Sequence, residues 1–72
     1  MKERPIKMSE IREAVTAIRV TSVTDAWTAH RMEDDLYVWV LSAIAEGTVP
    51  SPKAAAREAL KTLEIEFRRQ VA

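Results

Sequence analysis

The side chains best suited to chemistry in this 72-residue chain are a lone histidine and a short acidic run. His30 precedes Asp34 by about one helical turn, a spacing at which two side chains could share a metal ion. A metal site needs further ligands, however, and the chain has one histidine and no cysteine. We therefore interpret His30 as a structural or solvent-facing residue, and we predict no metal site.

The acidic run Glu33-Asp34-Asp35 is the second candidate for catalysis or metal binding. Consecutive residues of a helix point about 100° apart, so three neighbours cannot converge on one ion without other ligands. The N-terminus of a helix, where the dipole favours acids, explains the run better. The single glycine, Gly47, excludes a glycine-rich phosphate loop, a dinucleotide fingerprint and a nucleophile elbow. The sequence thus predicts neither an enzyme nor a bound cofactor.

An apolar segment, residues 36–45, dominates the elements that would position any site. Wound as a helix, its apolar side chains point in every direction, so several neighbours must cover it. A chain of this length forms one small domain with a limited core, and without cysteine it has no disulfide to compensate. We therefore predict a protein that is homodimeric or bound to another protein.

The same composition bears on location. The basic N-terminus is followed by charged residues where an export signal would be apolar, so we expect a cytoplasmic protein. The apolar segment is also about half as long as a bilayer-spanning helix, which argues against a membrane partner. Net charge is +2 over residues 1–20 (five basic, three acidic), −4 over 21–47 (one and five) and +2 over 48–72 (five and three). Because the total is zero, no overall basic field favours nucleic acid.

The chain is expected to begin with an extended arm. Residues 1–8 are polar and include Pro5, which lacks the backbone donor that a helix or a central strand needs. Ser9 is a good N-cap, and apolar residues at helical spacing follow it, so we predict a helix over about 9–20. Ser22 resembles the start of a capping arrangement for a second helix. The domain predicted from this pattern spans residues 9–72.

The middle of the chain carries two apolar stripes that do not join in phase. Acids at 33–35 suit a fresh N-terminus, so we predict two helices, about 23–31 and 33–46, with a bend or break between them. Aromatic and β-branched residues at Tyr37–Leu41 make a strand the alternative. The length of the apolar run and its end at Gly47 favour a helix.

A last helix is predicted over about 52–70. Ser51 suits the N-cap, and Pro52 suits the first helical position, where its missing donor costs nothing. Ile65 lies outside the apolar sector of this helix and is expected to face outward. One sector of about 120° holds the residues that we expect to be buried: Ala56, Ala59, Leu60, Leu63, Phe67 and Val71. The complete pattern predicts an all-α bundle of three to four helices with an antiparallel C-terminal hairpin.

Basic residues flank the apolar sector of the last helix. They are Lys53, Arg57, Lys61 and Arg68. Such a row could follow phosphates, or it could be a solvated face that pairs with the acidic middle of the chain. Glu64 within the row favours the second interpretation. In an antiparallel hairpin, Arg68 and Arg69 would approach the acids at 33–35.

The N-terminus carries a family resemblance. Arg4-Pro5-Ile6-Lys7-Met8-Ser9-Glu10-Ile11, followed by a helix, resembles the opening of the ribbon-helix-helix repressors. The resemblance implies a short strand that pairs with its twin in a dimer and reads the DNA major groove, with Arg4 and Lys7 as contacts. The chain departs from this pattern at Pro5, which removes a strand donor, and in its extra third helix. The opening residues 2–6 are also similar to those of some small phage-encoded proteins.

These observations predict a small non-enzymatic protein that binds or occludes a macromolecule, as a regulator or inhibitor does. Aromatic residues in a helical setting are typical anchors of cores and interfaces. The predicted partner contacts are Trp27, Tyr37, Trp39 and Ile65, with Arg57, Lys61 and Arg68 as a charged rim. The alternative is a DNA-binding transcriptional regulator of the ribbon-helix-helix type.

Overall fold

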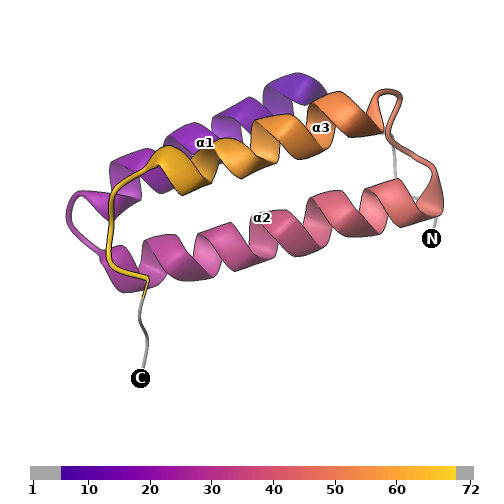
Figure 1. The fold of residues 1–72 in the computed structure, drawn as a ribbon. Helices are drawn as coiled ribbons and strands as arrows, with labels where there is room; N and C mark the ends of the chain where they lie inside the picture. Colours follow the sequence, from indigo (N-terminus) through magenta and orange to yellow (C-terminus); the bar gives the residue numbers. More distant parts are fainter. Residues whose placement is uncertain (1–5, 70–72) are drawn as a thin grey trace.

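The computed structural model describes residues 6–69, and the elements within that range are all helical. Helix α1 spans Met8–Ser22, α2 Ala26–Glu46 and α3 Pro52–Ala59, and a 3-10 helix, η1, spans Leu60–Glu64. Helices α1 and α3 lie side by side over one face of α2 (Figure 1). The predicted all-α bundle is therefore confirmed.

Helix α1 begins slightly earlier than predicted. Its N-cap is Lys7, whose backbone N–H donates to Glu10 Oε1 at 3.1 Å. Residues 1–5 of the predicted arm lie outside the described residues; of the rest, Ile6 is buried in the core. Ile6 and Lys7 form no strand, so the ribbon implied by the family resemblance is absent from this part of the chain.

The turn into α2 is capped by Asp25, and not by Ser22 as predicted. Asp25 Oδ1 accepts from the Thr28 backbone N–H at 3.0 Å, and Asp25 Oδ2 accepts from the Thr28 hydroxyl at 2.6 Å. These hydrogen bonds from Thr28 lower the pKa of the Asp25 carboxyl. Ser22 still belongs to α1, where its hydroxyl donates to the Arg19 carbonyl at 2.7 Å.

Helix α2 is continuous, so the predicted break near residues 31–33 is wrong, as is the strand alternative at Tyr37–Leu41. The acids at 33–35 do not start a helix, because Glu33 faces the interior in mid-helix. The predicted end is confirmed: Gly47 has a φ of 74°, a left-handed conformation that glycine adopts without steric cost.

Helix α3 starts as predicted, with Ser51 at the N-cap and Pro52 in the first turn, but it ends at Ala59. The prediction of a helix to residue 70 is wrong. After η1 the backbone becomes extended at Ile65, which turns the chain back onto α2. The Arg69 guanidinium donates to the carbonyls of Thr62 (2.6 Å) and Ile65 (3.1 Å) at the end of η1; the Thr62 carbonyl also accepts from the Ile65 backbone N–H at 3.0 Å.

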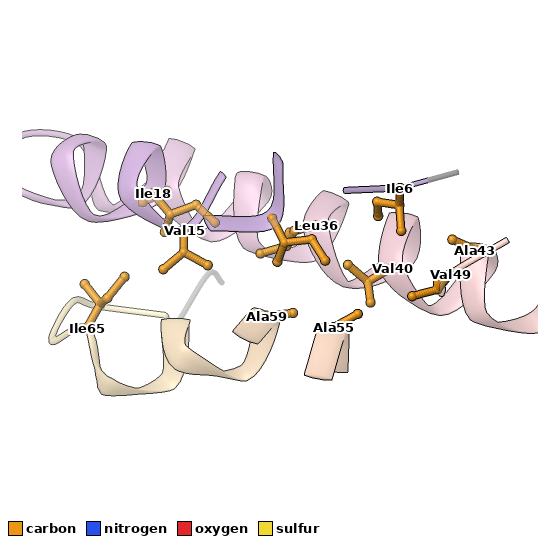
Figure 2. Close-up of a cluster of buried hydrophobic side chains, with 12 residues drawn as sticks. Ile6, Val15, Ile18, Leu36, Val40, Ala43, Val49, Ala55, Ala59 and Ile65 are labelled. Carbon is orange, nitrogen blue, oxygen red and sulfur yellow. The ribbon is translucent and has the colours of Figure 1, made fainter. Parts of the chain in front are cut away.

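The core lies where the three helices meet. Figure 2 shows Val15 and Ile18 of α1, Leu36 and Val40 of α2, and the small residues of α3 grouped together. Alanines at the contact positions of α3 allow this helix to approach the others closely. The buried apolar residues are Ile6, Ile11, Val15, Ile18, Ala29, Leu36, Val40, Ala43, Val49, Ala55, Ala59 and Ile65. Over residues 6–69 no helix combines the length and the apolar character that crossing a bilayer requires.

Candidate interaction surfaces

Among residues 6–69, no element covers the side of α2 opposite α1 and α3, which we call the bare side of α2 (Figure 1). Val38 is 65% exposed and Leu41 63% exposed on this side. Between α2 and α3 runs a groove of about 210 Å³, with the exposed Leu60 on its α3 edge. Apolar side chains line this groove: Tyr37, Val40, Leu41, Ala56, Ala59 and Leu60. We call Val38, Leu41, Leu60 and this groove the aliphatic face.

A second surface lies on the other side of α2, along its seam with α1. Trp39, 41% exposed, lines two hollows there, of about 340 and 350 Å³. Carboxylates surround the indole: Glu10 and Glu46 line the first hollow, and Asp35 lines the second. The remaining lining is Ile6, Ser42, Ala43 and Thr48 in the first, and Ala14, Ile18, Met32 and Leu36 in the second. We call Trp39 and its two hollows the Trp39 face.

Two of the aromatic residues predicted as partner contacts lie outside the Trp39 face. Trp27 is exposed at the start of α2, where the Arg31 guanidinium lies 5.2 Å from its ring centroid. It is about 18 Å from Trp39 along the helix, too far to share a small contact patch. Tyr37 is half-buried: its hydroxyl is hydrogen-bonded to Thr62 and lies 3.4 Å from Glu33. Burial raises the pKa of that hydroxyl. Its hydrogen bonds are therefore made inside the fold and are not available to a partner.

Ile65 was predicted to face outward, and this is wrong. It is 7% exposed because the chain leaves the helix there and folds inward. Leu60 and Leu63, predicted to be buried, are exposed instead. This segment packs through Ala55, Ala59 and Thr62, a different side from the predicted sector, and Leu60 points about 100° away from Ala59. Beyond Leu60, the 3-10 turn, with about 120° per residue instead of 100°, shifts the phase further.

The predicted basic rim is on the surface. Arg57, Lys61 and Arg68 are exposed, and Lys61 pairs locally with Glu58 at 3.0 Å. Of the predicted DNA contacts, Lys7 is exposed beside α1, and Arg4 lies outside the described residues. Arg57 belongs to α3 and Lys61 to η1, whereas Arg68 lies in the segment after η1, so the structure does not bring the three rim residues together, and none of them lines the hollows at Trp39.

A buried ion pair joins the C-terminal segment to α2. Glu33, 3% exposed, accepts from Arg69 Nε at 3.0 Å and from Arg69 Nη2 at 3.1 Å. The Arg69 guanidinium also lies 4.0 Å from the Phe67 ring centroid. Burial alone would raise the pKa of Glu33, but hydrogen bonds from Arg69 and Thr62 and the charge of Arg69 lower it overall. The predicted approach of Arg69 to the acidic run is confirmed at Glu33.

The histidine has no metal-site geometry. His30 Nε2 lies 3.5 Å from Asp34 Oδ2, and His30 Nδ1 lies 4.0 Å from Glu33 Oε1. Glu33 is already bound to Arg69. Within the described part of the chain, no group of three or more histidine, cysteine or acidic residues is placed to hold a metal ion.

Comparison with known proteins gave no match to a family model, to a curated protein or to a solved structure. The two faces are therefore interpreted from their own chemistry. Sequence reasoning identified Trp39, but it did not identify Leu60 as a surface residue. It did indicate that residues 36–45 have more apolar surface than their neighbours cover, and the exposure of Val38 and Leu41 agrees with this.

Proposed function

We propose that this chain is a small non-enzymatic interaction module that binds another protein through the Trp39 face. One observation carries the proposal: a large aromatic side chain stands exposed between two hollows on the rigid surface of α2. Tryptophan is enriched among the residues that dominate binding energy at protein interfaces. Binding there would cover part of the partner's surface, which is how a small regulator or inhibitor acts.

The lining of the two hollows suggests the chemistry of the partner. Each hollow has apolar residues at its base and at least one carboxylate in its lining. A segment that carries an apolar side chain beside lysine or arginine residues fits this combination. The apolar side chain would pack against the indole, and the basic groups would lie near Asp35 and Glu46, both of which are exposed.

Quantitative affinity capture tests the proposal. The full chain, a Trp39→Ala variant and a Trp27→Ala variant are immobilised separately, and the proteins retained from a lysate are measured by mass spectrometry. Trp27 is a matched control because it is also exposed and lies on the same helix. We expect a protein that the wild type and Trp27→Ala retain and Trp39→Ala loses by about tenfold or more. Equal retention by all three variants would contradict the proposal.

A further inference from the structure

The aliphatic face has the residue spacing of a helix–helix seam. On the bare side of α2, exposed residues recur at alternating intervals of three and four: Arg31, Asp34, Val38, Leu41 and Ala45. This interval keeps side chains in line along one side of a helix, as interdigitation with a second helix requires. Val38 and Leu41 form the apolar centre of the row, and the charged residues Arg31 and Asp34 lie toward one end.

The adjoining groove offers a place for the ridge of a second copy. Val38 and Leu41 project as a ridge, and the apolar groove between α2 and α3 lies directly beside Leu41. A surface with a ridge next to a groove can pair with an identical surface related by a two-fold axis, each ridge filling the other's groove. The aliphatic face therefore has the shape that a symmetric dimer needs.

Charge selects the direction of this pairing. Lys53 and Arg57 are exposed on α3 and have no ion pair among residues 6–69. Lys53 precedes Leu60 by seven residues and so lies on the same side of α3. The chain after Pro52 runs antiparallel to α2, because Thr62 lies beside Tyr37 whereas Ala56 and Ala59 lie beside Leu41. Lys53 and Arg57 are therefore level with the C-terminal half of α2. Asp34 lies toward the opposite end.

We propose that two copies of this chain associate through the aliphatic face, with the two α2 helices antiparallel. An antiparallel arrangement brings Asp34 of each copy toward Lys53 and Arg57 of the other, so opposite charges meet at both ends of the contact. Arg31 lies one turn farther out on the same row, over the Trp27 ring, so Asp34 is the charge of the row nearest these cations. A parallel arrangement would place like charges together. The Trp39 face stays open in this dimer, so the association goes beyond the proposed binding of another protein.

Sedimentation equilibrium of the full chain tests the association. The chain has a mass of 8.1 kDa, and we expect the weight-average mass to rise toward twice that value with concentration. Leu41→Glu should increase the dimer Kd by at least about 100-fold, because it places a carboxylate in the apolar centre. Val23→Glu is the matched control: Val23 is an exposed valine in the turn between α1 and α2, and its substitution should leave the Kd unchanged. Circular dichroism verifies that both variants are folded.

A charge exchange tests the antiparallel direction. Asp34→Lys alone, and Lys53→Glu with Arg57→Glu, should each weaken self-association by about tenfold. Mixed in equal amounts, the two variants should form a heterodimer within about threefold of the wild-type affinity, because both contacts again join opposite charges. A mixture as weak as its components overturns the antiparallel arrangement.

Two outcomes overturn the dimer itself. One is a wild-type chain that remains at 8.1 kDa up to about 1 mM. The other is a dimer that Leu41→Glu leaves intact and Trp39→Ala dissociates, since self-association would then use the Trp39 face. The second result would also contradict the proposed function, whereas the first would leave it standing.

Discussion

The inner and outer sides of α2 each contain an exception to the usual distribution of residue types. Glu33 is a charged residue and is almost completely buried, while Val38, five residues later, is mostly exposed. The difference comes from the neighbours: α1, α3 and the C-terminal segment cover the inner side and supply Arg69 to Glu33, whereas no described element covers the outer side. At these two positions, the available neighbours decide burial, and hydrophobicity does not.

Truncation of one leucine on each side should give the largest contrast. Leu36→Ala removes a buried side chain from the centre of the core and should lower the free energy of unfolding by about 3 kcal/mol. Leu41→Ala on the outer side should change it by less than about 0.5 kcal/mol when the chain is monomeric. Urea denaturation at low protein concentration measures both. Similar losses for the two variants would show that the outer side is covered in the folded monomer.

Arg68 and Arg69 allow a buried contact and an exposed charge to be compared at neighbouring positions. Arg69→Met leaves the Glu33 carboxylate without its main partner, and we expect a loss of about 2 kcal/mol. This is below the range for a fully enclosed pair because Arg69 is partly exposed. Arg68→Met removes an exposed charge and should cost less than about 0.5 kcal/mol. Equal effects in thermal or urea unfolding would mean that the ion pair does not hold the C-terminal segment on α2.

The same pair predicts a pH dependence of stability. The pKa of Glu33 is lower in the folded chain than its ordinary value of 4.5, so the unfolded chain binds a proton more readily. Glu33 therefore stabilises the fold above about pH 4.5, and this contribution is lost as the pH falls through the lower folded pKa. We expect the difference in unfolding free energy between the wild type and Glu33→Gln to shrink on acidification. A difference that stays constant from pH 7 to pH 3 would contradict this assignment.

The sequence predicted the helix boundaries that depend on local signals. Gly47 ends α2 because its left-handed conformation is available to glycine, and Pro52 begins α3 because a first-turn residue needs no donor. Charge order along the chain also predicted that Arg69 approaches Glu33. Each of these features is determined by a residue type at one position or by complementary charges.

The errors concern features that depend on distant residues. The two apolar stripes suggested a break, but the first of them does not pack in the core: Val23 lies in the turn before α2 and is exposed, and Trp27 is exposed as well. A continuous helix therefore needs to bury only the second stripe. The burial of Glu33 depends on Arg69, 36 residues later in the chain. The end of α3 could not be inferred from helical periodicity, since Arg69 and the inward turn at Ile65 determine it. The exposure of Leu60 has a different cause: α3 packs through Ala55 and Ala59, and this leaves Leu60 outside the buried side.

Tyr37 marks the boundary between the two sides, and its substitution should have a smaller effect than that of Leu36 or Arg69. Its ring lines the groove of the aliphatic face, while its hydroxyl is hydrogen-bonded to the fully buried Thr62. Tyr37→Phe keeps the ring and removes the hydroxyl, so it should cost about 1 kcal/mol in unfolding free energy. It should leave the proposed dimer unchanged. This result would show that the hydroxyl of Tyr37 contributes to folding stability, whereas its ring belongs to the aliphatic face.

A double-mutant cycle with Thr62→Val isolates this hydrogen bond. If the two hydroxyls stabilise each other, the coupling energy from urea denaturation should be about 0.5–1.5 kcal/mol, because the second substitution then removes a bond that the first has already broken. Zero coupling would mean that Thr62 is satisfied by Glu33 alone. The hydroxyl of Tyr37 would then contact the inner side only through Glu33, 3.4 Å away.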